Sequence, residues 1–171
     1  MKIAIAKTEI IHFVGIGGIG MSGLSLIMKG KGCKVQGSDL SLNKNVERLK
    51  KEKIKIFIGQ KKQNLKDATI VVVSSAIKKN NPEIIEAKRK NLPIIKRGKM
   101  LAHIVSLMKN IVVVGSHGKT TTTSLITSIF QTTKIDPTII NGGVINSINN
   151  TAKLGKSDWS ILEADESDGS F

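Results

Sequence analysis

The sequence is poor in the residue types that form disulfides and that stack on nucleic-acid bases. It has one cysteine, Cys33, and its four phenylalanines and one tryptophan, with no tyrosine, make up 3% of the chain. A single cysteine excludes an internal disulfide and a cysteine-rich metal site, which predicts a cytoplasmic protein. The net charge of +14, from 27 Lys and Arg against 13 Asp and Glu, raises nucleic acid as a partner. Because the lysines are scattered and few aromatic side chains accompany them, we expect no nucleic-acid partner.

The chain also lacks a long uninterrupted apolar segment. Its most apolar stretch, Ile10 to Met28, holds five glycines and His12, so we expect a folded strand, turn and helix there. We therefore expect neither a signal peptide nor a membrane partner. A length of 171 residues suits one domain, or one domain plus part of a second.

The first motif is a glycine-rich loop between an expected strand and an expected helix. The apolar run Ile10–Val14 is typical of a buried strand, and the helix is expected over about 21–28. A second strand, over 34–38, leads to Asp39, roughly twenty residues past the glycines. This order predicts a Rossmann-type unit in which a diphosphate approaches the helix N-terminus and Asp39 bonds a ribose hydroxyl. The loop glycines are Gly15, Gly17, Gly18 and Gly20. Which nucleotide is held stays open, and an NAD-dependent oxidoreductase is one alternative.

Strand-like and helix-like segments go on alternating after Asp39. This alternation predicts an α/β fold, a Rossmann-like parallel sheet with helices on both faces. We expect helices over about 43–52, 82–90 and 99–107, and strands over 55–58, 68–73 and 94–95. Ser74 and Ser75 follow one of these strands, so their hydroxyls could bond a ligand beside the glycine loop, or they could only cap a helix. Arg97 could meet a phosphate or a carboxylate, or it could lie in solvent.

A phosphate-binding loop follows about a hundred residues after the glycine loop. Behind an expected strand over 111–114, Gly115 and Gly118 let backbone N–H groups turn inward, Lys119 can reach the outer phosphates, and Thr120 can bind Mg²⁺. The usual pattern has a glycine where this chain has Val113, so the loop is a shortened form. Because one sheet does not need a second such loop, we predict a domain boundary. Residues 1–107 would form the Rossmann-like domain, and residues 108–171 would begin an incomplete P-loop α/β domain.

The second domain is expected to end in an acidic segment. Before it we expect a helix over about 120–131, a strand leading into a turn at Asn141-Gly142-Gly143, and a loop over 144–156. A strand over 159–162 then runs into Glu163, which we predict to be the second Mg²⁺ ligand beside Thr120. The alternative is a solvated acidic loop. Five acidic residues are gathered in this part of the sequence: Asp158, Glu163, Asp165, Glu166 and Asp168.

Five motifs in this order resemble the Mur ligases of peptidoglycan synthesis. They are His12–Gly23, Ser74–Ile77, Gly115–Thr122, Asn141–Gly143 and Glu163–Asp168. The resemblance covers essentially the whole chain from Ile10 to Phe171 and includes the short phosphate loop. It implies a Rossmann-like domain that binds a UDP-sugar, followed by a central ATPase domain, with ATP and Mg²⁺ as cofactors.

The resemblance also implies which residues form the two sites. The UDP-sugar site would comprise Gly15, Gly17, Gly18, Gly20, Met21, Ser22, Asp39, Ser74 and Ser75. The ATP site would comprise Gly115, Ser116, His117, Gly118, Lys119, Thr120 and Thr121. Lys119 and His117 would act in catalysis, Thr120 and Glu163 would hold Mg²⁺, and the Asn141 turn would line the site.

Within the family, the pattern most resembles the members that join L-alanine to UDP-N-acetylmuramate through an acyl phosphate. The Glu-Ser-Asp sequence at 166–168 favours them over the relatives that recycle murein tripeptide. Family members are more than twice as long, so we expect a truncated form that needs the C-terminal portion of the ligase for activity. A UDP-sugar-binding module without catalysis is the first alternative, and the NAD-dependent oxidoreductase is the second.

Overall fold

The computed structural model describes residues 5–145 and 150–163. The chain divides into two compact units, residues 1–100 and residues 101–171. Each unit has its own sheet, and each is described by itself below.

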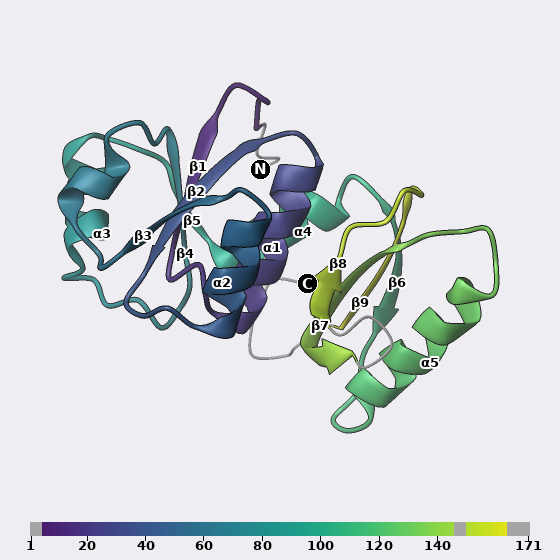
Figure 1. Ribbon diagram of the computed structural model, residues 1–171. Helices are drawn as coiled ribbons and strands as arrows, with labels where there is room; N and C mark the ends of the chain where they lie inside the picture. Colours follow the sequence, from purple (N-terminus) through teal and green to yellow (C-terminus); the bar gives the residue numbers. More distant parts are fainter. Residues whose placement is uncertain (1–4, 146–149, 164–171) are drawn as a thin grey trace. The chain divides into compact units, whose positions relative to one another are not determined.

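The first unit is built on a five-stranded parallel sheet. Its strands are β1 (Ile10–Val14), β2 (Lys34–Asp39), β3 (Lys55–Ile58), β4 (Ile70–Val73) and β5 (Ile94–Lys96). They lie in the order β3-β2-β1-β4-β5 (Figure 1). The central strand β1 is the most deeply buried, with Ile11, Phe13 and Val14 fully inaccessible to solvent. A continuous apolar run of this kind is what a strand covered on both faces requires.

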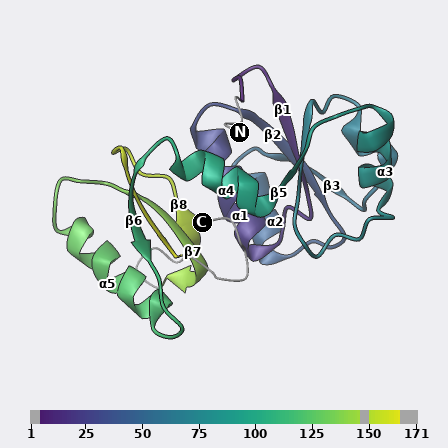
Figure 2. The same ribbon diagram turned by 180° about the vertical axis from the view of Figure 1, so that it is seen from behind.

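Helices cover both faces of this sheet, which confirms the predicted fold class. The helices are α1 (Ile19–Gly30), α2 (Lys44–Lys51), the short 3₁₀ helix η1 (Lys62–Leu65), α3 (Pro82–Arg89) and α4 (Arg97–Val105). α1 and α2 lie side by side on one face, and α3 lies with η1 on the other (Figures 1 and 2). The strand order reverses between β1 and β4, and right-handed crossovers therefore place the two sets of helices on opposite faces. In such sheets a ligand binds at this reversal, beyond the carboxyl ends of the strands.

The second unit has a four-stranded sheet and one long helix. Its strands are β6 (Lys109–Val113), β7 (Thr138–Ile145), β8 (Asn150–Lys153) and β9 (Trp159–Glu163), in the order β6-β9-β7-β8. The first three strands of that order are parallel, and β8 pairs antiparallel with β7. Helix α5 (Lys119–Gln131) packs against the sheet and buries Thr123 and Thr127.

Two predictions for this unit are wrong. Asn141-Gly142-Gly143, predicted to be a turn, lies within β7, and the expected loop over 144–156 contains β8. Asparagine and glycine are depleted in strands, but the pairing of β7 with β8 shifts its register between Ile140 and Ile145. Glycine is common at such irregularities, so the residues that indicated a turn belong to a strand with a break in its ladder.

The remaining differences are at element ends. α1 begins at Ile19 and α4 at Arg97, each two residues before its expected start, and η1 was not predicted. Among the residues that the structure describes, no helix has the length and apolar character needed to cross a membrane.

Candidate functional site

The glycine loop of the first unit is held by the end of the neighbouring strand β2. The amides of Gly15 and Ile16 both donate to the carbonyl of Ser38, at 2.8 and 2.9 Å. The next amide, that of Gly17, donates to Oδ2 of Asp39 at 2.8 Å. Three consecutive loop amides are therefore bonded to two consecutive residues of β2.

The carboxylate of Asp39, predicted to bond a ribose hydroxyl, accepts hydrogen bonds from backbone amides of the protein itself. Besides the Gly17 amide it accepts the amide of Ser41, at 3.3 Å to Oδ1. The Gly17 carbonyl in turn accepts a hydrogen bond from Asn45 Nδ2, at 2.9 Å. Asp39 and Asn45 thus each hold the loop by a hydrogen bond to Gly17, the first to its amide and the second to its carbonyl. A bond from Asp39 to a ligand stays a prediction.

The N-terminus of α1 forms an anion-binding environment. Its N-cap residue is Gly18, which offers no side-chain cap, and the first turn contains no acidic residue. Arg97 extends over this turn, because a Cβ added to Gly20 would lie 2.8 Å from Arg97 Nη1. The first amides of a helix lack intrahelical acceptors, and a nearby cation adds to the positive end of the helix dipole. This end of the helix therefore suits a phosphate or a carboxylate.

Two residues predicted to touch the UDP-sugar lie on the buried face of α1. The side chain of Met21 is 2% exposed and lies in the core. Ser22 is fully buried, and its hydroxyl donates to the carbonyl of Ile19 at 2.9 Å. Contact of either residue with a ligand stays a prediction, and the structure gives both of them a packing role.

Ser74 and Ser75 follow β4, at the same edge of the sheet as the glycine loop. β4 pairs with β1 in parallel, with Val73 opposite Val14, so both strands end at the carboxyl edge of the sheet. Ser74 is half-buried and Ser75 is exposed. Neither caps α3, whose N-cap is Asn81, which accepts the amide of Glu83 at 2.8 Å. Neither serine therefore has the role of capping α3, and their contact with a ligand stays a prediction.

The phosphate loop of the second unit has the backbone that its glycines were predicted to allow. Gly115 has φ +147° and Gly118 has φ +75°, both in the region that favours glycine. Gly118 is the N-cap of α5, and a Cβ added there would meet no atom within 4 Å. The helix N-terminus is therefore open above the loop. Lys119 folds back, and its Nζ donates to the Gly115 carbonyl at 2.5 Å.

The other predicted residues of this loop face solvent. Four of them are exposed: Ser116, His117, Thr120 and Thr121. Because the loop amides and these side chains are accessible around an open helix N-terminus, a nucleotide phosphate can reach them without rearrangement of the core.

Glu163 lies at the same edge of the second sheet as this loop. It is the last residue of β9 and pairs with Val113, the last residue of the parallel strand β6. The strand pairing therefore brings the Glu163 position to the start of the phosphate loop, 50 residues away in sequence from Val113. Within the described ranges 5–145 and 150–163, no three His, Cys, Asp or Glu side chains form a metal-binding group.

The donor set of this edge nevertheless fits Mg²⁺. Thr120 supplies a hydroxyl and Glu163 a carboxylate, and Mg²⁺ is usually bound by one or two protein oxygens together with waters and substrate phosphates. Asp158 is not part of this arrangement, because it precedes β9 and pairs with Lys109 at 3.1 Å, at the opposite end of the strand. Asp165, Glu166 and Asp168 lie outside the described residues.

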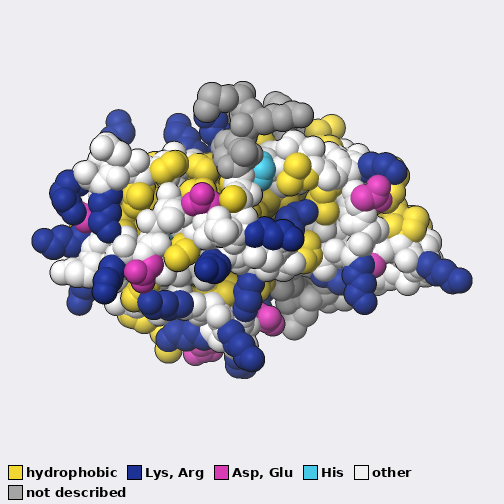
Figure 3. Space-filling model, turned by 90° about the horizontal axis from the view of Figure 1, so that it is seen from above, with side chains coloured by type: hydrophobic (Ala, Val, Ile, Leu, Met, Phe, Trp, Pro, Cys, Tyr) yellow, Lys and Arg dark blue, Asp and Glu magenta, His cyan; other side chains and the backbone are white. Residues whose placement is uncertain are grey.

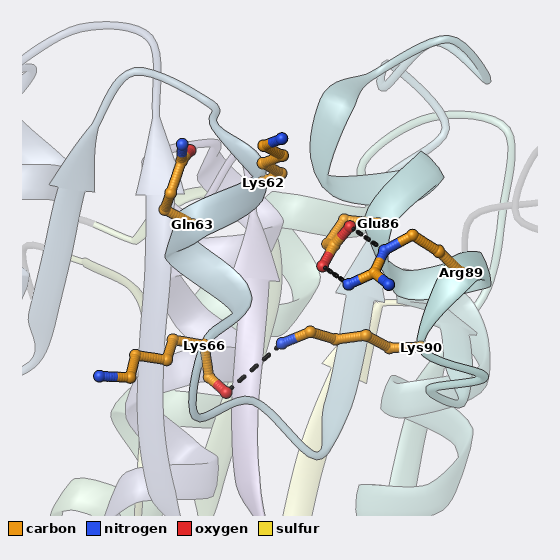
Figure 4. Close-up of a pocket in the computed structure, with 6 residues that line it drawn as sticks. All are labelled: Lys62, Gln63, Lys66, Glu86, Arg89 and Lys90. Carbon is orange, nitrogen blue, oxygen red and sulfur yellow. Dashed lines mark hydrogen bonds and ion pairs between the residues drawn. The ribbon is translucent and has the colours of Figure 1, made fainter.

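A hollow of about 330 Å³ lies between η1 and α3, and it contains no predicted site residue (Figure 4). Glu86 and Arg89 form a bidentate pair there, with both N–O distances at 2.8 Å. The hydrogen bond from Arg89 lowers the pKa of the Glu86 carboxyl, and nearby lysines add to the effect. The lining residues are Lys62, Gln63, Lys66, Glu86, Arg89 and Lys90.

The positive charge of the chain is dispersed on the face drawn in Figure 3. Lys and Arg side chains there alternate with apolar and neutral polar ones and do not form one block.

Sequence reasoning missed the residues that support the glycine loop from β2 and α2. Ser38 could have been noticed because it precedes Asp39 at the end of a strand. Asn45 carried no signal, because its bond to Gly17 spans 28 residues and depends on how α2 packs beside the loop.

Comparison with known proteins places these features in one family. A sequence profile described as "Mur ligase family, catalytic domain" matches residues 10–109, more than half of the chain. A Pelagibacter ubique (strain HTCC1062) protein named UDP-N-acetylmuramate–L-alanine ligase is 77% identical over all 171 residues, which cover 37% of that protein.

Two solved structures are similar to this chain as well. A UDP-N-acetylmuramate–alanine ligase from Thermotoga maritima has a TM-score of 0.81 and 31% identity, covering 90% of this chain and 36% of its own. A murein peptide ligase from Psychrobacter arcticus has a TM-score of 0.84 and 26% identity, covering 92% and 38%. The chain spans about a third of the length of the curated relatives it matches. Because the profile matches more than half of its length, this chain belongs to the Mur ligase family.

Proposed function

We propose that this chain is the UDP-sugar-binding and ATP-binding part of an ATP-dependent ligase that joins L-alanine to UDP-N-acetylmuramate in peptidoglycan precursor synthesis. The observation that carries the proposal is a pair of unlike phosphate-binding loops, one in each unit. The second loop has Glu163 at the end of the adjacent parallel strand. The names of the 77%-identical relative and of the Thermotoga structure support the choice of substrates.

In the first unit, the diphosphate of the UDP-sugar would lie at the N-terminus of α1. The amides of Gly15 and Gly17 already donate to Ser38 and Asp39 of β2, so they would not donate to the ligand. The loop would instead present a fixed surface to it. The ligand's negative charge would meet the first amides of α1 and the guanidinium of Arg97. Ser74 and Ser75 would add hydroxyl donors from the neighbouring strand end.

In the second unit, ATP phosphates would lie over the N-terminus of α5. Lys119 would exchange its bond to the Gly115 carbonyl for one to the outer phosphates. Thr120 and Glu163 would hold Mg²⁺, which supplies positive charge to the phosphate oxygens. His117, exposed in the loop, would lie beside the transferred phosphoryl group.

The chemistry has two balanced steps. The muramyl carboxylate oxygen bonds to the γ-phosphorus of ATP, and ADP leaves, which gives an acyl phosphate. The amine of L-alanine then bonds to the acyl carbon, phosphate leaves with the electron pair of the broken C–O bond, and the amine loses a proton. We assign no residue of this chain to L-alanine. A cytoplasmic location, where ATP is available, belongs to the same proposal.

The second loop argues against the oxidoreductase alternative. Hydride transfer from a nicotinamide cofactor does not need a second nucleotide-type loop with a carboxylate at the end of the adjacent parallel strand, and this chain has both. Asp39 does not discriminate between the two, because each of its oxygens accepts one amide and a carboxylate has about four acceptor sites.

Calorimetric titration of the purified chain with UDP-N-acetylmuramate and with ATP and Mg²⁺ tests the proposal. Lys119→Met is expected to weaken ATP binding at least about tenfold, or about 1.4 kcal/mol, and to leave UDP-sugar binding unchanged. Lys134→Met is the matched control, an exposed lysine just beyond α5 in the same unit. UDP-sugar binding without ATP binding would support the binding-module alternative. Binding of NADH with no response to the UDP-sugar would refute the proposal.

A further inference from the structure

A cluster of five buried polar side chains lies between the first sheet and the layer of η1 and α3. His12, Ser38 and Glu83 are fully buried, and Gln36 and Asn64 are 5% and 8% exposed. His12 comes from β1, Gln36 and Ser38 from β2, Asn64 from η1 and Glu83 from α3. The fold does not require polar side chains from four elements at this place, since apolar side chains would fill the same space at no hydrogen-bonding cost.

The hydrogen bonds fix the direction of each donor in this cluster. Gln36 Nε2 donates to the Asn64 carbonyl at 3.0 Å, which sets the orientation of the Gln36 amide. The same nitrogen lies 3.2 Å from His12 Nδ1, so Nδ1 is the acceptor and the imidazole carries its proton on Nε2. Nε2 lies 3.4 Å from Oε2 of Glu83 and makes no hydrogen bond with any of the residues that the structure describes.

Glu83 is therefore surrounded by donors. Ser38 Oγ donates to its Oε2 and Asn64 Nδ2 to its Oε1, both at 2.6 Å. Distances this short are typical of hydrogen bonds to a charged acceptor, which are about twice as strong as neutral ones. Glu83 also lies in the first turn of α3, where the helix dipole stabilises a carboxylate.

One of these two bonds acts on the residue that holds the glycine loop. Ser38 uses its side chain to reach Glu83, and its carbonyl accepts the amides of Gly15 and Ile16. Ser38 thus links α3 on one face of the sheet to the loop that begins α1 on the other. The adjacent residue, Asp39, takes the Gly17 amide.

We propose that Glu83 is a positioning residue for the glycine loop. Its buried carboxylate fixes Ser38, and Ser38 sets the position of Gly15 and Ile16 and, through them, the phosphate-binding N-terminus of α1. This inference rests on the proposed function, in which that N-terminus binds the diphosphate of a UDP-sugar. Glu83 touches no ligand itself, because it is fully buried on the α3 side of the sheet.

Glu83→Gln in the full chain is the test, because glutamine keeps the size of the side chain and removes its charge. The dissociation constant for UDP-N-acetylmuramate is expected to rise about tenfold, the effect of one lost bond to a charged group. Amide hydrogen exchange at Gly15 and Ile16 is expected to accelerate by a similar factor, and exchange at Leu24, inside α1, to stay unchanged. Glu86→Gln is the matched control. Glu86 lies one turn further along α3, and its carboxylate faces Arg89 (Figure 4).

Ser38→Ala provides the second variant and serves alone if Glu83→Gln does not fold. It should have the same two effects, and the double variant should be no worse than the more affected single variant, because both break one link. A merely structural role would accelerate exchange throughout the unit and leave the affinity of the folded chain unchanged. That result, or unchanged exchange at Gly15 and Ile16, overturns the proposal. If the wild-type chain does not bind UDP-N-acetylmuramate, the proposed function fails, and the exchange data alone decide the role of Glu83.

Discussion

Gly17 is the position where the glycine loop tolerates a side chain least. A Cβ added there would lie 2.6 Å from Asn43 Nδ2, 2.7 Å from Val46 Cγ2 and 2.8 Å from Asp39 Oδ2. Real Cβ atoms do not approach other atoms so closely, so Gly17→Ala must displace the loop or its neighbours. The backbone of Gly17 is not in the left-handed region, so the effect is one of space and not of backbone strain.

The expected loss of stability follows from two opposing effects. Overpacking of a well-packed site costs about 1–3 kcal/mol, and stretching the bond from the Gly17 amide to the Asp39 carboxylate adds up to about 1.5 kcal/mol. Replacing glycine also restricts the backbone of the unfolded chain, which stabilises the folded state by about 0.4–1 kcal/mol. We therefore expect Gly17→Ala to lower the free energy of unfolding of the first unit by about 2–3 kcal/mol.

Urea unfolding followed by the backbone amide resonances of β1 measures this change. The only tryptophan, Trp159, lies in the second unit, so its fluorescence reports on the wrong part of the chain. With a slope of about 1 kcal/mol per molar urea, the midpoint should fall by about 2–3 M. Gly18→Ala is the control, since its Cβ would approach the Gly15 carbonyl oxygen only to 3.3 Å. It should cost about 1 kcal/mol or less. Equal midpoints for the two variants would refute the steric reasoning.

Two further predictions concern the second unit. Lys153 donates a hydrogen bond to Asp136 at 2.6 Å, and this bond lowers the pKa of the Asp136 carboxyl. The stability it contributes is present above the ordinary aspartate pKa of about 3.9 and is lost as the pH falls through the lower folded-state value. Lys153→Met should therefore cost about 0.5 kcal/mol at pH 7, since both side chains are about a third exposed or more, and should flatten the pH dependence of unfolding below about pH 4. An unchanged acid slope would contradict this assignment. Thr123 Oγ1 is buried and has no hydrogen-bond partner among the described residues, so Thr123→Val should raise the free energy of unfolding by up to about 1 kcal/mol in a urea titration, and a loss of stability would show that the hydroxyl is satisfied.

Elements defined by local patterns could be predicted from the sequence. The apolar runs of β1 and β3 have the bounds that were expected, because a short apolar run next to a turn leaves few alternatives. The glycines and Lys119 of the phosphate loop were likewise predictable, since the loop is continuous in sequence. The errors at β7 and β8 arose where long-range pairing outweighed local preference, because β8 pairs with β7 on both sides of Asn141-Gly142-Gly143, at Ile140 and at Ile145.

The acidic residues of the predicted Mg²⁺ site show the same limit of prediction from local sequence. Asp158 and Glu163 are close in sequence, and together they predicted one acidic cluster. A strand separates consecutive residues by about 3.3 Å each, so the five residues of β9 carry them to opposite edges of the sheet. Of the two, Glu163, at the carboxyl edge, is the candidate ligand beside the phosphate loop.

The sequence by itself determined two glycine loops that each precede a helix, a carboxylate at the end of a strand, and the family to which they belong. These features are local, and each is written in a few consecutive residues. The tertiary structure alone decided how the loops are held. The bond from Ser38 to Glu83 spans 45 residues and that from Gly17 to Asp39 spans 22, so both exist only because parallel strands and the helices on either face bring distant segments together. Local periodicity carries no information about such pairs, because it does not specify which segments pack against each other.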